Sequence, residues 1–134
     1  MGAFKDKSDK TFSSGELLLS NAHYNSSVHC FYYSYFQLVK DLLKEEYKYS
    51  DSQMNSGTNN SSSHDKIINQ LRICLLEESR INCNIIISLF SLIKKARKKA
   101  DYKEQNIGKK EAEKTKDRAT EIRKELNKIY RNGI

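Results

Sequence analysis

The strongest constraint on the fold is a run of apolar residues between Val28 and Leu43. They recur at steps of three and four, which is the spacing of one face of an α-helix. The set comprises Val28, Phe31, Tyr32, Tyr35, Phe36, Leu38, Val39, Leu42 and Leu43. At about 100° per residue it covers an arc of about 160°, wide enough to touch two or three neighbouring helices. The segment is therefore predicted to be the central helix of a bundle.

Helical patterns flank this segment on both sides. A first helix is predicted within residues 5–22, where ELLLSNA ends at Asn21. Asparagine takes the left-handed conformation found at many helix C-termini more readily than most residues. After a polar stretch, Ser62 or Ser63 can cap a third helix of about four turns.

Two further helices are predicted towards the C-terminus. One runs from Asn82 or Asn84 to Tyr102, and the last runs from Lys109 to Tyr130. The apolar stripe of the last helix is narrow, so this helix is expected on the outside of the bundle.

The composition agrees with a helical protein. The 134 residues include no proline and five glycines, and 31% are charged, whereas strand-rich chains usually need more turn residues. Residues 1–134 are long enough for a single domain. The polar segment at about residues 48–62 cannot offset its ordering entropy by burial and is predicted to be a mobile loop. The expected fold is an all-α, up-and-down bundle of four to five helices.

The cysteines and the N-terminus bear on location. Cys30, Cys74 and Cys83 match neither a disulfide framework nor a zinc site, so no metal or other cofactor is expected. The opening MGAFKDKSDK is charged where a signal peptide needs an apolar run, and no segment approaches the ~18 apolar residues of a membrane span. A cytoplasmic protein without a membrane partner is expected.

Positive charge is concentrated in the last third of the chain. Residues 94–134 carry fifteen Lys and Arg against seven Asp and Glu, whereas residues 1–93 carry nine against ten. This asymmetry can mark a phosphate-binding face. Alternatively, the charges belong to a solvated helix with ion pairs three residues apart. Those pairs would be Glu113 with Lys116, Glu121 with Lys124, and Glu125 with Lys128.

Three motifs occur in an order that resembles the HEPN domain (higher eukaryotes and prokaryotes nucleotide-binding). The first is LLLSNAHYNSSVHCFYYSYFQLVKDLL, with leucines at 17–19 and the tyrosine pair Tyr32 and Tyr33. The second, SSSHDKIINQL, resembles the Ser-His start of the family's third helix. The third, RKKADY from Arg97 to Tyr102, resembles the Arg-x-x-Ala-Asp-Tyr end of its fourth helix. Together they cover most of residues 16–130.

The resemblance implies a helical bundle that commonly forms a homodimer. Such proteins are often encoded beside a nucleotidyltransferase partner or act in toxin–antitoxin or defence systems, and RNA or a nucleotide is the implied ligand. Family members that cut RNA use Arg followed four to six residues later by His, but His23, His29 and His64 all precede Arg97. Tyr102 stands at the histidine position, and a phenol with a pKa of about 10 is a poor general base. Ribonuclease activity is therefore expected to be degenerate or absent.

The predicted binding cleft joins Tyr33, His64, Arg97, Asp101 and Tyr102. Arg97 falls inside the apolar arc of its helix and needs a partner, since an unpaired buried charge is costly. That partner is either Asp101, four residues later, or an anionic ligand gripped by the guanidinium fork. His64 either caps and closes its loop or hydrogen-bonds a ligand near Arg97.

A secondary ridge on the central helix comprises His29, Tyr33, Gln37 and Lys40. It lies away from the core residues Tyr32, Tyr35 and Phe36, and it can stack a base or pack on a dimer partner.

The leading hypothesis is a HEPN-like, nucleotide- or nucleic-acid-linked interaction module. One alternative is a metal-independent ribonuclease with a divergent site at Arg97 and Tyr102. Another is a scaffold or dimerisation protein without a ligand of its own.

Overall fold

The computed structural model describes residues 3–50, 63–102 and 106–129, and within these ranges it contains five α-helices and no strand. The helices are α1 (Ala3–Ser20), α2 (Tyr24–Glu45), α4 (Ser63–Glu78), α5 (Arg80–Tyr102) and α6 (Lys109–Ile129). The prediction of an all-α bundle is confirmed, and each predicted helix is present. The predicted mobile loop lies largely at residues 51–62, outside the described ranges.

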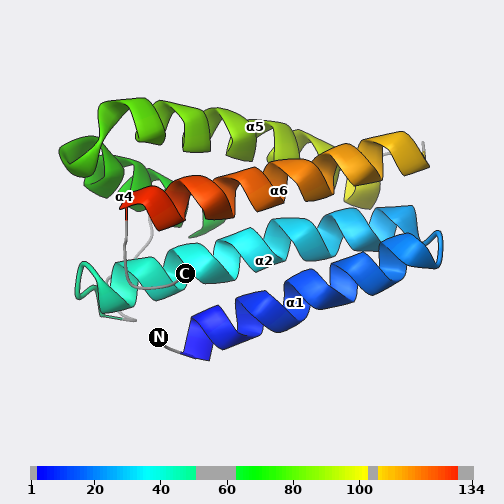
Figure 1. Ribbon diagram of the computed structural model, residues 1–134, viewed down its shortest axis with the longest axis horizontal. Helices are drawn as coiled ribbons and strands as arrows, with labels where there is room; N and C mark the ends of the chain where they lie inside the picture. The colour runs from blue at the N-terminus through cyan, green and yellow to red at the C-terminus, as the bar shows by residue number, and fades with distance from the viewer. Residues whose placement is uncertain (1–2, 51–62, 103–105, 130–134) are drawn as a thin grey trace.

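The helices pack as two antiparallel hairpins with α4 beside them (Figure 1). α1 and α2 form one hairpin, α5 and α6 form the other, and α4 packs against α2 and α5. α2 contacts each of the other four helices, as predicted for a central helix. α6 buries a narrow stripe that includes Ala112, Ile122 and Leu126, as expected of an outer helix.

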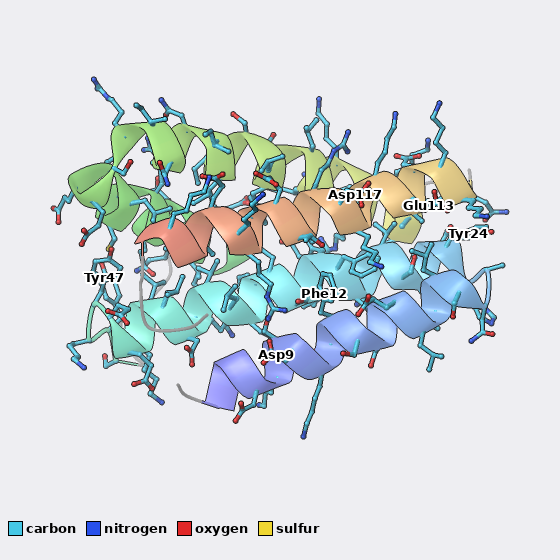
Figure 2. The ribbon with its side chains drawn as sticks, viewed as in Figure 1. Asp9, Phe12, Tyr24, Tyr47, Glu113 and Asp117 are labelled. Carbon is cyan, nitrogen blue, oxygen red and sulfur yellow. The ribbon has the colours of Figure 1, made fainter. Side chains whose placement is uncertain are left out.

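α1 is held to the bundle by ring contacts and by an ion pair. Figure 2 shows Asp9 and Phe12 on the side of α1 that faces the other helices. The Phe12 ring lies 5.2 Å from that of Phe31, and Asp9 pairs with Arg123 of α6. Gly15 permits this close approach, because an added Cβ would stand 2.8 Å from a ring carbon of Phe31.

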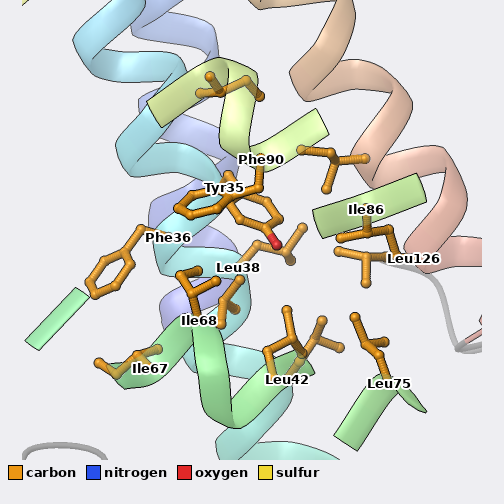
Figure 3. Packing of buried hydrophobic residues seen from close by; sticks show 14 of the residues in the cluster. Tyr35, Phe36, Leu38, Leu42, Ile67, Ile68, Leu75, Ile86, Phe90 and Leu126 are labelled. Atoms are coloured by element: carbon orange, nitrogen blue, oxygen red, sulfur yellow. The ribbon is translucent and has the colours of Figure 1, made fainter. Parts of the chain in front are cut away.

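The core contains most of the aromatic residues of α2. Tyr35 packs on Phe90 of α5 at 4.9 Å between ring centroids, above an aliphatic layer that includes Leu42, Ile86 and Leu126 (Figure 3). Tyr32, Tyr35 and Phe36 are all buried, which confirms their prediction as core residues.

The turn between α1 and α2 differs from its prediction in one residue. Ala22, not Asn21, takes the left-handed conformation, with φ of 63°. The amide of Ala22 bonds to the Leu19 carbonyl and that of His23 to the Leu18 carbonyl, which is the Schellman arrangement. Asn21 is therefore the C-cap of α1, and the residue after it reverses the chain.

One side chain ties the two hairpins together at the end where α2 begins. Asn25 donates from Nδ2 to the Ala100 carbonyl at 3.1 Å and accepts at Oδ1 from the Ile107 amide at 2.8 Å. The start of α2 is thus fastened to the end of α5 and to the segment that precedes α6. A small second core of Val28, Ala96, Ile107 and Ala112 fills the space beside this junction.

Ion pairs on α6 follow the predicted spacing in one of three cases. Lys128 pairs with Glu125 at 3.0 Å as predicted. Glu113 instead pairs with Lys109, and Lys116 reaches Glu16 of α1 at 3.1 Å. The predicted pair of Glu113 with Lys116 is therefore absent, because Lys116 has a partner on α1, and Glu121 forms no ion pair with Lys124 in the described part of the chain.

Candidate functional site

Arg97 is the centre of a polar cluster between α2 and α5. Its Nε lies 3.0 Å from Asp101 Oδ2, one helical turn away, and its Nη2 donates to the Tyr33 hydroxyl at 3.3 Å. The guanidinium carbon lies 4.9 Å from the centre of the Tyr32 ring and 5.7 Å from that of Tyr33. The side chain is 13% exposed, so the carboxylate and the two rings stabilise a charge that would otherwise be costly to bury.

His29 completes this cluster from the first half of α2. Its Nδ1 lies 3.0 Å from Asp101 Oδ2 and 3.3 Å from Oδ1, and its ring centre is 4.5 Å from that of Tyr33. Because a carboxylate only accepts hydrogen bonds, Nδ1 carries the proton of the neutral ring. Nε2, on the opposite side of the ring, is then the nitrogen that can accept a proton. We call His29, Tyr33, Arg97 and Asp101 the Arg97 cluster.

Three of the five predicted cleft residues therefore come together. Tyr33, Arg97 and Asp101 are in direct contact, and the predicted ion pair between Arg97 and Asp101 is present. The side chains of His64 and Tyr102 lie outside the described part of the structure, so their predicted roles stay predictions.

The secondary ridge is divided between two environments. His29 and Tyr33 join the Arg97 cluster, and Tyr33 is half-buried by contacts within its own chain. Further along α2, Lys40 lies over the Phe36 ring at 4.9 Å, and Gln37 is half-buried. The ridge is therefore less exposed than its sequence pattern indicates.

An open hollow of about 380 Å³ adjoins the cluster. Its lining comprises Asn25, Ser26, His29, Cys30, Ala100 and Asp101. A second hollow of about 300 Å³, lined in part by His23, Tyr24 and Asn106, shares Asn25 and Ser26 with the first. A small ligand in the first hollow would thus contact the imidazole of His29 and the carboxylate of Asp101.

Cys30 lines the same hollow but is poorly suited to covalent chemistry. Burial raises the pKa of its thiol, so the protonated form prevails at neutral pH. Because the thiolate is the reactive form, Cys30 is a weak nucleophile here. The chemistry available at this site is that of an imidazole oriented by a carboxylate, with a guanidinium and a phenol beside it.

Asn25 is the structural residue of this site that sequence analysis missed. It follows the first residue of α2, where an asparagine is unremarkable, and its partners lie 75 and 82 residues away. No local sequence pattern could have identified them.

Comparison with known proteins gives no relative for the chain. No family model matches it, and neither a curated protein nor a solved structure is significantly similar to it. Among the described residues, no helix is both long and apolar enough to cross a membrane, and no three His, Cys, Asp or Glu side chains are grouped as metal ligands.

Proposed function

We propose that this protein is a HEPN-like interaction module that binds RNA or a nucleotide at the Arg97 cluster. The observation that carries the proposal is the Arg97 cluster, in which Asp101 and two tyrosine rings fix Arg97. Two members of the cluster, His29 and Asp101, line an open hollow. The order of the three sequence motifs and the helical bundle support the family assignment. A homodimer and a nucleotidyltransferase partner follow from the same resemblance.

The chemistry of the cluster suits a nucleotide in two respects. A guanidinium offers a planar set of donors that matches phosphate oxygens, and the adjoining Tyr33 and His29 rings offer faces on which a base can stack. Asp101 offsets the charge of Arg97, so binding here depends on stacking and directed hydrogen bonds as well as on net charge.

The test compares two arginines of the same chain. Binding of AMP, ATP and a short fluorescent RNA is measured for the wild-type protein, for Arg97→Ala and for Arg72→Ala. Arg72 is an exposed arginine on α4 bonded to Asn69, so it controls for loss of one positive charge. We expect Arg97→Ala to weaken binding about tenfold or more, the usual effect of losing a charge-assisted hydrogen bond, and Arg72→Ala to leave it unchanged.

Two milder variants separate binding from folding. His29→Ala removes a ring that is 45% exposed, and Tyr33→Phe keeps the ring but removes the hydroxyl. Both should keep the thermal stability close to that of the wild type, and His29→Ala should weaken binding. Wild-type protein that binds none of the probes, or equal losses in Arg97→Ala and Arg72→Ala, would refute the site and favour a scaffold without a ligand.

The pairing of His29 with Asp101 favours a second candidate, a metal-independent ribonuclease. In this candidate His29 acts as the catalytic histidine, the role for which Tyr102 occupies the expected position in the sequence. In this scheme Nε2 of His29 accepts the proton of a ribose 2′-hydroxyl, whose oxygen attacks the adjacent phosphorus. The bond between the phosphorus and the 5′-oxygen breaks, and the 5′-oxygen takes a proton from water, which gives a 2′,3′-cyclic phosphate and a 5′-hydroxyl end. His29 then returns its proton to the solvent.

Cleavage is tested in EDTA with labelled RNA and with the same sequence bearing 2′-O-methyl groups. The candidate predicts cyclic-phosphate products from RNA alone, with loss of cleavage in His29→Ala but not in His23→Ala. Intact RNA after prolonged incubation with wild-type protein would eliminate it.

A further inference from the structure

Several basic side chains of α5 and α6 have no acidic partner among the residues that the structure describes. α5 carries six Lys and Arg residues and a single acid, Asp101. Lys94, Arg97 and Lys99 have ion-pair partners. Lys95, Lys98, Lys110, Lys114 and Arg118 take part in no ion pair within the described ranges.

Three of these uncompensated cations line one hollow on the outside of α6. Lys110, Lys114 and Arg118 border a space of about 420 Å³ together with Gly108 and Glu111. They stand four residues apart, so each step along the helix rises about 6 Å. Glu111 does not cancel them, because its carboxylate is held by Lys99 of α5 at 3.0 Å. We call Lys110, Lys114 and Arg118 the α6 cation row.

The contact between Lys99 and Glu111 also fixes how α5 lies against this row. The two helices are antiparallel and side by side (Figure 1), so Lys95, one turn before Lys99, lies level with the middle of the row. Lys98, which is exposed, lies between Lys95 and Asp101 along α5. Figure 2 shows nitrogen-tipped side chains projecting outwards along α5 and the first half of α6.

We propose that the α6 cation row binds the phosphate backbone of a single-stranded nucleic acid. This inference rests on the function proposed above and gives it a second contact surface. Regularly spaced cations match a ligand that carries one negative charge per repeat, which is what a phosphodiester chain provides. The Arg97 cluster then holds a base or terminal nucleotide, and the row holds the adjoining strand.

The lining of the hollow argues against a protein partner. Its described residues include no apolar or aromatic side chain, whereas peptide partners are anchored by such residues. Without an aromatic platform the row cannot read bases, so it contributes affinity without sequence preference. The cations are on a regular helix, which keeps their spacing constant when the ligand is absent.

The test measures how binding depends on salt. A fluorescent single-stranded RNA is titrated by anisotropy at several salt concentrations between about 50 and 200 mM, the range over which phosphate contacts weaken strongly. The variant carries Lys110→Gln, Lys114→Gln and Arg118→Gln. The matched control carries Lys10→Gln, Lys48→Gln and Arg80→Gln, which remove two exposed lysines and one exposed arginine at the opposite end of the bundle. Glutamine retains a good helix propensity, and circular dichroism checks the fold.

We expect the variant of the α6 cation row to reduce the slope of log K against log salt by about 2, since each contact with a single strand contributes about 0.7. The control should keep the wild-type slope. Equal reductions in both variants would show that total charge and not this row is responsible, and an unchanged slope in the row variant would also overturn the inference. Binding of an acidic peptide in preference to RNA, lost in the row variant, would assign the row to a protein partner and refute the inference.

The two proposals fail separately. If Arg97→Ala loses nucleotide binding while the row variant keeps the full salt slope, the Arg97 site stands and the row does not. If the row variant has a reduced salt slope while Arg97→Ala binds nucleotides normally, the proposal for the α6 cation row is supported and the proposal for the Arg97 cluster is refuted.

Discussion

Asp101 serves two elements at once, because its carboxylate contacts Arg97 on its own helix and His29 on α2. The first contact was predictable from sequence, since residues four apart share a helix face. The second was not, because it joins residues 72 apart and depends on how far α2 is shifted along α5. The sequence analysis therefore grouped Tyr33, Arg97 and Asp101 correctly, but it placed His29 in a separate ridge and not beside Asp101.

A double-mutant cycle measures the value of this shared carboxylate. Asp101→Asn should lower the free energy of unfolding by about 1–3 kcal/mol, because Arg97, 13% exposed, loses its charged partner. In a protein that already carries Arg97→Gln, adding Asp101→Asn should lower the free energy of unfolding by much less. Urea unfolding of the four proteins gives the coupling energy, and additive effects would mean that the ion pair contributes nothing to stability.

Tyr35 provides a second prediction for a single residue. Its hydroxyl is buried and has no hydrogen-bond partner among the described residues. Burial, followed by the nearby Cys83 and Tyr32, raises the pKa of Tyr35 well above its ordinary value near 10. Tyr35→Phe removes a polar group without a partner, so we expect it to stabilise the protein by about 1 kcal/mol at neutral pH.

The same pKa direction predicts a loss of stability in alkali. With the pKa raised in the folded state, the unfolded chain releases the Tyr35 proton first, at about pH 10. The contribution of Tyr35 is complete below that pH and is lost as the pH rises above it. Thermal melts at pH 8 to 11 should therefore fall less steeply for Tyr35→Phe, and identical pH profiles for the two proteins would contradict the prediction.

At the scale of helices, periodicity was a good guide and caps were a weaker one. Four to five helices were predicted and the described residues form five, because the apolar residues of α2, α4, α5 and α6 recur at helical spacing. The turn at Asn21 was placed within one residue, but the left-handed position belongs to Ala22. Residue preference favours asparagine or glycine at the left-handed position. In this turn the position is instead set by the hydrogen bonds from Ala22 to Leu19 and from His23 to Leu18, which make Ala22 the left-handed residue.

Replacement of Ala22 tests this turn. A left-handed conformation costs an L-residue about 1–2 kcal/mol, and glycine avoids that cost at the expense of some unfolded-state entropy. Ala22→Gly should therefore raise the unfolding free energy by about 0.5–1 kcal/mol, and Ala22→Val should lower it. Chemical denaturation of both variants decides, and destabilisation by glycine would show that the turn is not strained.

Across the whole molecule, the central place of α2 was predicted from the width of its apolar arc. The pairing of α5 with α6 and the junction at Asn25 were not, because they depend on contacts between distant segments. The charge asymmetry was visible in the sequence, but the cations without an acidic partner among the described residues became apparent once the ion pairs were located.

Hydrogen exchange can locate the effect of this junction. Asn25→Ala removes both bonds of the side chain and should speed exchange of the Ile107 amide, while amides near Leu42 in the core of α2 keep their protection. Asn25→Asp keeps the acceptor for Ile107 but loses the donor to Ala100, so it should retain more of the protection at Ile107. Uniform acceleration along the chain would mean that Asn25 supports global stability instead.

The long reach of Asn25 also bears on the order in which the protein folds. Its two hydrogen bonds join residues that are 75 and 82 positions apart in the sequence, so they close large loops. Such contacts become favourable after helices that are nearer in the sequence have come together. The hollow beside His29 is thus expected to form after α5 and the segment before α6 have packed against the start of α2. A nascent chain emerging from the ribosome would have a nearly finished interior before it could hold any ligand there.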